Sequence, residues 1–224
     1  MKKIIILMIL TFSFISVHCY GFIYANWPCL LYFGQCPPKN SGQSSIQSMP
    51  PTLGKLSIEA AGFFLQANID FQAFLKKVEL SEISAINYDE MSILLNNSIE
   101  NLESANFLYY QVFEMSKTLA LNPFVMKKLK QLDYRIFEEN SNFIPSILED
   151  VKSFLQPGNM TGAFEIIYND TGEILQCMKS LKILLDSNSI DIPQCWNINQ
   201  RLLRSALFGQ YISQVFFEIK KSMK

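Results

Sequence analysis

The sequence predicts an all-α protein: an antiparallel up-and-down bundle of four to five long helices, preceded by a signal sequence and a Pro/Ser-rich tether. Two observations support the prediction. Beyond Gly54, apolar residues recur at spacings of three and four, the period of a helix buried on one side, and no segment shows the alternation of a strand. The predicted helices are also joined by only a few residues, which makes consecutive helices antiparallel neighbours.

Residues 1–19 have the layout of a signal peptide. Lys2 and Lys3 form a basic start, and an apolar run without charge extends from Ile4 to Val17. Such a run is too short for a comfortable membrane span but is typical of secretory signals. We therefore expect an exported protein.

The end of this segment resembles a bacterial lipobox, Ser16-Val17-His18-Cys19, in which the cysteine is lipidated. Ser16 and His18 replace the usual Leu and small residue of that motif, so ordinary cleavage and an uncleaved anchor remain alternatives. Cys19 is the lipidation candidate. If it is modified, the protein is anchored to the bacterial cell envelope; if ordinary cleavage occurs, the protein is secreted.

The chain has five cysteines, and setting Cys19 aside leaves Cys29, Cys36, Cys177 and Cys195. An even number of cysteines in an oxidising compartment indicates disulfides. We favour the local pairing, Cys29–Cys36 with Cys177–Cys195, over the two crossed pairings and over four free thiols. No C-x-x-C motif is present, so nothing supports a thioredoxin-like role.

Residues 20–53 are predicted to form an apolar Cys loop and a polar tether. Five of the nine prolines lie between Trp27 and Thr52, and Lys39 to Ser48 is rich in Ser and Gln. Such a composition cannot bury enough surface to fold alone. The apolar segment before it either docks on the helices or inserts at a membrane interface.

Residues 54–224 are predicted to form the helical domain. Its helices are expected at about Lys55–Leu80, from Asn87 to about Leu119, from Asn122 to Phe154 with a kink at Pro145, at Met160–Asp186 and at Ile198–Lys221. Residues 187–196 are expected to form a loop. With five helices in antiparallel order, Lys179, Lys182, Arg201 and Arg204 fall at the end where the tether joins, and Glu149 and Asp150 at the other.

Composition excludes several functions. The formal net charge of −1 argues against a nucleic-acid partner. The only histidine is His18, so a mature chain has no Ser-His-Asp or Cys-His site and no Glu-x-x-His metal motif. No Walker A loop or dinucleotide fingerprint occurs, and we expect no catalytic residue, cofactor or metal site.

The remaining candidates for chemistry are weak. Three pairs of adjacent carboxylates occur, but neighbours in a helix do not share a face. Asn96, Asn159 and Asn169 begin glycosylation sequons, two of them within predicted helices.

We therefore expect no enzyme. The sequence favours an exported, membrane-anchored helical protein that acts by surface or protein–protein interaction. It would have a protein partner of unknown identity and would contact the membrane surface through its N-terminus. The alternatives are a freely secreted, disulfide-bonded four-helix ligand and a carrier of apolar ligands.

Overall fold

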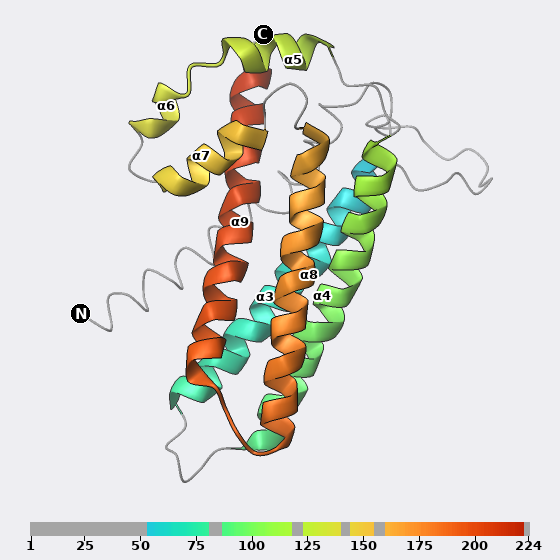
Figure 1. The fold of residues 1–224 in the computed structure, drawn as a ribbon, viewed down its shortest axis with the longest axis vertical. Coiled ribbons are helices and arrows are strands. Elements are labelled where there is room, and N and C mark those ends of the chain that lie inside the picture. Colours follow the sequence, from blue (N-terminus) through green and yellow to red (C-terminus); the bar gives the residue numbers. More distant parts are fainter. Residues whose placement is uncertain (1–52, 81–86, 118–122, 140–143, 155–159, 222–224) are drawn as a thin grey trace, which may run out of the picture.

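The computed structural model describes residues 53–80, 87–117, 123–139, 144–154 and 160–221, and this part of the chain is all-α. The prediction of fold class is confirmed to that extent. The predicted signal peptide and tether lie outside the described residues, as do Cys19, Cys29, Cys36 and Asn159. The described helices (Figure 1) are α3 Leu53–Leu80, α4 Tyr88–Ser116, α5 Pro123–Gln131, α6 Arg135–Glu138, α7 Pro145–Phe154, α8 Met160–Asp186 and α9 Ile192–Lys221.

The start of α4 is where the sequence predicts it. The Asn87 side chain accepts a hydrogen bond of 3.2 Å from the backbone N–H of Glu90. A helix leaves its first N–H groups without partners, and an N-cap side chain satisfies one of them. Asp89 and Glu90 in the first turn also suit the positive end of the helix dipole.

The prediction of one kinked helix from Asn122 to Phe154 is wrong, because three shorter helices lie in this range. Helix α5 ends at Gln131, Leu132 and Asp133 are not helical, and α6 is a single turn. The Asp133 carboxylate accepts a bond of 3.1 Å from the backbone N–H of Arg135, two residues on. Such a local bond competes with helix continuation. Pro145 then begins α7, a position where proline is tolerated because it needs no N–H partner.

The last helix begins six residues before its predicted start at Ile198, and the predicted loop is correspondingly shorter. The Asp191 carboxylate accepts a 3.0 Å bond from the backbone N–H of Gln194, as an N-cap does. Pro193 lies in the first turn, where it costs no hydrogen bond. In the turn that follows α8, Asn188 lies in the left-handed region (φ 55°), a conformation that asparagine tolerates just beyond helix ends.

The long helices α3, α4, α8 and α9 lie side by side, while α5, α6 and α7 lie toward one end (Figure 1). Consecutive long helices run antiparallel, as their contacts show. Asn101 of α4 reaches Asp70 of α3 at 3.1 Å, while Lys77, further along α3, pairs with Glu90 near the start of α4 at 2.6 Å. Helices α8 and α9 are joined in the same antiparallel sense, by Glu173–Arg201 and by the bond from Gln194 to Cys177.

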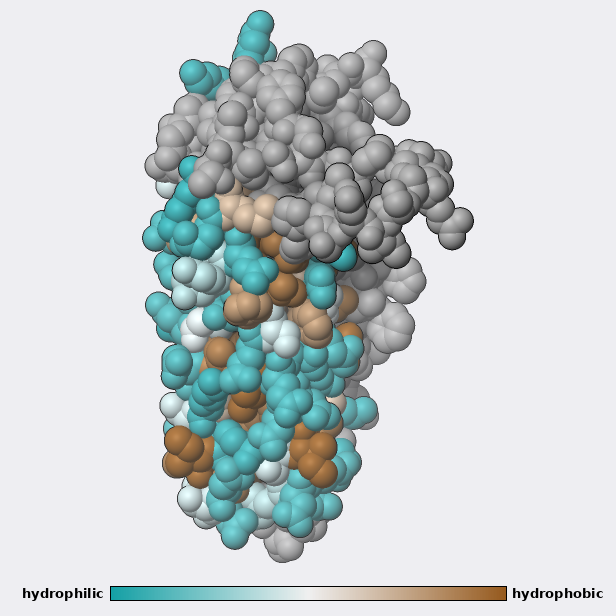
Figure 2. Space-filling model, turned by 90° about the vertical axis from the view of Figure 1, so that its right-hand side faces the viewer, coloured by the Kyte–Doolittle hydropathy of each residue, from teal (hydrophilic) through white to brown (hydrophobic). Residues whose placement is uncertain are grey.

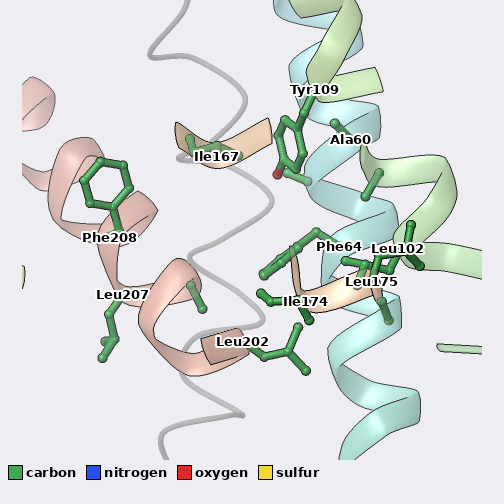
Figure 3. Close-up of a cluster of buried hydrophobic side chains, with 14 of the residues drawn as sticks. Ala60, Phe64, Leu102, Tyr109, Ile167, Ile174, Leu175, Leu202, Leu207 and Phe208 are labelled. Carbon is green, nitrogen blue, oxygen red and sulfur yellow. The ribbon is translucent and has the colours of Figure 1, made fainter. Parts of the chain in front are cut away.

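The core lies between the long helices. Figure 3 shows Phe64 of α3 pointing toward Ile174 and Leu175 of α8, while Tyr109 of α4 lies near Ile167. These side chains are buried, as are many other apolar residues at helical spacing, among them Ala60, Phe71, Leu95, Leu102, Met178 and Leu202. Burying a large apolar side chain contributes about 1.5 to 3 kcal/mol, so this stripe is the main source of stability.

Ser98, which is buried, and Asn106, which is half-buried, fix how α4 sits against its two neighbours. The Ser98 hydroxyl donates to the carbonyl of Ala67 in α3 at 2.7 Å. The Asn106 amide donates to the Tyr168 carbonyl at 2.7 Å and to the Thr171 hydroxyl at 2.8 Å, both in α8. Buried polar groups are costly without partners, so these bonds define one register of α4.

The broken third helix reverses the expected direction of α8 and α9, and the predicted separation of charge is therefore wrong. Lys179 pairs with Glu103 midway along α4 at 2.6 Å. Arg204 pairs with Asp150, which was expected at the opposite end of the molecule. Basic and acidic residues are thus mixed along these helices.

We predict that Asn106→Ala destabilises the protein by about 1 to 3 kcal/mol, because two bonds between helices are lost and their partners lose a donor. Asn97→Ala, at an exposed position on the same helix, is the matched control and should change stability by less than about 0.5 kcal/mol. Urea unfolding followed by circular dichroism measures both. Equal effects of the two substitutions would contradict the register role of Asn106.

Candidate functional site

The described residues contain two hollows with chemically distinctive linings. The first, the charged pocket, has a volume of about 360 Å³ and lies between α7, α8 and α9. It is lined by Asp150, Ile166, Asp170, Glu173, Ile174, Arg201, Arg204, Ser205 and Phe208. Three carboxylates and two guanidinium groups therefore share one cavity.

Two ion pairs hold most of these charges. Arg201 of α9 bonds Glu173 of α8 at 2.8 Å, and Arg204 of α9 pairs with Asp150 of α7. The partners are substantially exposed, and exposed pairs contribute only about 0 to 1 kcal/mol each. Their effect is therefore positional, because they orient two guanidinium groups beside the cavity.

Asp170 is the remaining carboxylate of the charged pocket. It is half-buried and accepts a hydrogen bond of 3.2 Å from the Ser205 hydroxyl. Burial raises its pKa, and Glu173 raises it further, while the Ser205 hydrogen bond and the charges of Arg204 and Arg201 oppose the shift. A perturbed carboxyl group in a cavity is typical of functional sites.

The second hollow, the aromatic groove, has a volume of about 320 Å³ and lies where α4 meets α8. It is lined by Glu103, Asn106, Phe107, Tyr110, Tyr168, Leu175 and Lys179. Phe107 is 61% exposed and Tyr110 43% exposed, which is unusual for large aromatic side chains. The rings of Tyr110 and Tyr168 are 5.3 Å apart between centroids, so the aromatic wall is continuous across the two helices.

The surface around the aromatic groove is mixed and acidic. Figure 2, which views the molecule from the side on which α4 lies in Figure 1, shows apolar residues between columns of polar ones. Glu100 lies one turn before Glu103, and Glu114 one turn after Tyr110, so both share this side of α4. Glu165 lies one turn before Tyr168 on α8. With Glu103, helical spacing therefore places four carboxylates along this side of α4 and α8, against two lysines, Lys117 and Lys179; these six residues are called the rim.

Two of the cysteines predicted to form disulfides, Cys177 and Cys195, lie in the described residues, on the neighbouring helices α8 and α9. The Gln194 side chain donates to the Cys177 carbonyl at 3.0 Å, which places the first turn of α9 against α8 beside Cys195. Both cysteines are free thiols in the structure, so the predicted Cys177–Cys195 bond is not formed there. Cys195 is 1% exposed, and burial raises its pKa to about 12.

The two described sequons have a structural explanation. Asn96 and Asn169 are exposed, but the third residue of each sequon, Ser98 or Thr171, is completely buried. The Ser98 hydroxyl donates a hydrogen bond to the Ala67 carbonyl of α3, and the Thr171 hydroxyl donates one to the Ile167 carbonyl at 2.8 Å. Packing between helices therefore accounts for these hydroxyl groups without glycosylation.

Neither the charged pocket nor the aromatic groove was predicted as a site. Asp150, Arg201 and Arg204 were assigned to ends of the molecule, and Asp170 to the interior of the predicted helix Met160–Asp186. The only available signal was the i, i+3 spacing of Asp170 with Glu173 and of Arg201 with Arg204, which places each pair on one face of its helix. Within the described part, no group of three His, Cys, Asp or Glu residues is arranged to hold a metal ion.

None of the described helices is both long and apolar enough to cross a membrane. No family model matches the chain, and neither a curated protein nor a solved structure shows significant similarity to it. The geometry of the two hollows is therefore the basis for assigning function.

We predict that non-reduced peptide mapping of the protein purified from its native host joins Cys177 to Cys195. Such a disulfide would cross-link α8 to α9 and stabilise the fold by roughly 3 kcal/mol in the chain-entropy model. A Cys29–Cys195 peptide would show that the pairing is wrong. Two alkylated thiols would show that no bond forms, and Cys177 should then react faster than the buried Cys195.

Proposed function

We propose that this chain is a non-enzymatic, exported helical protein that binds a partner protein through the aromatic groove. In this proposal the four long helices form one up-and-down bundle that serves as a rigid scaffold. The observation that carries it is the exposure of Phe107 and Tyr110 beside Tyr168, in a groove that two helices define. Exposed aromatic side chains in a hollow are the residues that dominate binding energy in protein interfaces.

The chemistry of the groove indicates the kind of partner. Its lining is mostly apolar and aromatic, and it lies where two helices meet, which suits an amphipathic helix laid along it. The carboxylates of the rim outnumber its lysines, so a complementary helix carries Lys or Arg beside its apolar face. We therefore propose a basic amphipathic helix as the occupant.

The proposal places the protein outside the cytoplasm, held at a membrane surface by its N-terminus. The basic start and apolar run of residues 1–19 support export, and the lipobox-like Ser16 to Cys19 supports lipidation. Residues 39–48 would act as a spacer between the lipid and the helices. A freely secreted ligand is the alternative if Cys19 is not modified.

The carrier hypothesis has less support. A carrier encloses its apolar ligand, whereas the aromatic groove is open to solvent and the charged pocket is lined by acidic and basic side chains. Neither hollow offers a dry apolar cavity.

We predict that a photo-crosslinking amino acid at position 107, in the native host, captures one partner through a helical segment with basic residues flanking apolar ones. The same label at position 69, an exposed isoleucine on α3, is the matched control and should not capture it. With the purified partner, Phe107→Ala should weaken binding by about 2 kcal/mol, roughly thirtyfold in Kd, and Ile69→Ala should have no effect. Equal capture at both positions, or an unchanged Kd for Phe107→Ala, would rule the groove out.

Attachment is tested separately. We predict that the native protein fractionates with membranes and is released by detergent, and that Cys19→Ser makes it soluble or blocks its processing. Intact mass spectrometry measures the modification directly. A mature chain that begins at an unmodified residue such as Phe22 or Asn26 would exclude lipidation and favour the secreted ligand, without bearing on the groove.

A further inference from the structure

The charges of the charged pocket do not balance. Each guanidinium group already has a carboxylate partner, Arg201 with Glu173 and Arg204 with Asp150. Asp170 has the Ser205 hydroxyl instead, and no cation among the described residues lies within ion-pair distance of it. When all five groups are ionised, three carboxylates face two guanidinium groups, so the pocket holds one negative charge too many.

An unmatched charge at a half-buried position carries a cost. A carboxylate that is partly removed from water loses hydration, and only a cation or several hydrogen bonds make up for it. The raised pKa of Asp170 reflects this cost. A single positive group placed beside Asp170 would neutralise the pocket.

The rest of the lining indicates what such a cation is attached to. Ile166, Ile174 and Phe208 contribute apolar surface to the same cavity. The volume of about 360 Å³ is at the lower end of the range for small-molecule sites, roughly 300 to 1,000 Å³. The described carboxylates are not arranged to share a metal ion. A compact charge with an apolar tail fits this combination.

We propose that the charged pocket binds a small primary amine, with its ammonium group paired to Asp170 and its alkyl chain against Ile166, Ile174 and Phe208. An ammonium group has three donors, and Asp170 has lone pairs beyond the one that the Ser205 hydroxyl uses. An anionic ligand is disfavoured, because both guanidinium groups are already paired and Asp170 would repel it. This site is separate from the aromatic groove and does not depend on the proposed protein partner.

The test is isothermal titration calorimetry, in which pentylamine is titrated into the full chain. The heat of the same injections into protein-free buffer is subtracted. We expect saturable binding that strengthens along methylamine, propylamine and pentylamine as more apolar surface is covered. Neutral 1-pentanol, of the same length, should bind at least about tenfold more weakly, because an ionic hydrogen bond is lost. Pentanoate, which reverses the charge, should not bind.

Two variants locate the site. Asp170→Asn keeps an acceptor for Ser205 but removes the charge, and it should weaken pentylamine binding about tenfold or more. Glu59→Gln, at an exposed carboxylate on α3 outside both hollows, is the matched control and should leave binding within about twofold. Circular dichroism and the unfolding midpoint of each variant establish that it is folded.

Several results would overturn the proposal. Absence of saturable pentylamine binding, unchanged binding by Asp170→Asn, or equal binding of 1-pentanol would each exclude an ammonium site at Asp170. Tighter binding of pentanoate would assign recognition to Arg201 and Arg204 instead. Equal affinities of methylamine and pentylamine would show that the alkyl chain does not pack against Ile166, Ile174 and Phe208.

Discussion

The constraint on which the structure depends is that α4 packs against α3 on one side and α8 on the other in a single register. Apolar stripes alone do not set this register, because similar side chains repeat along each helix. Ser98 and Asn106 set it, since each has a hydrogen-bond partner on a neighbouring helix. Sliding α8 by one turn would leave the Tyr168 carbonyl out of reach of Asn106. Specificity of packing here comes from a few polar groups between the helices, while most of the stability comes from the apolar core.

Both hollows follow from this register, and both use α8. The aromatic groove lies where α8 meets α4, and the charged pocket lies where α8 meets α9 and α7. Tyr168 and Asp170 are only two residues apart, yet they line different hollows, because neighbouring residues in a helix face different directions. Occupation of either hollow would therefore bear on the same stretch of α8.

The sequence predicts the helices well wherever a long apolar stripe and a good cap agree. Asn87 with Glu90 is such a case, and α4 begins there. The prediction fails between Asn122 and Phe154, where the apolar stripe keeps its phase but local bonds break the helix. Asp133 lies where the helix stops, and its carboxylate accepts a hydrogen bond from the backbone N–H of Arg135. Apolar periodicity takes no account of such side-chain hydrogen bonds. The sequence also contains a signal for the early start of α9, because Asp191 followed by Gln194 fits a capping pattern.

The candidate sites could not be predicted to the same degree. A hollow between helices depends on which helices are neighbours and in which direction they run, and one error in the third helix reversed α8 and α9. Arg204 and Asp150 were thereby assigned to opposite ends although they form an ion pair. Phe107 and Tyr110 lie off the buried face of α4, so periodicity leaves them exposed, but it does not reveal that α8 brings Tyr168 beside Tyr110.

The order of the four long helices has a practical consequence for studying the protein. Because α3 and α9 run in opposite directions, the start of α3 and the end of α9 lie at the same end of the described structure (Figure 1). A fluorophore or affinity tag added after α9 would therefore lie at the same end as the first turn of α3. The turn around Asn188, between α8 and α9, is at the opposite end and exposed, so it is the better place for a reporter.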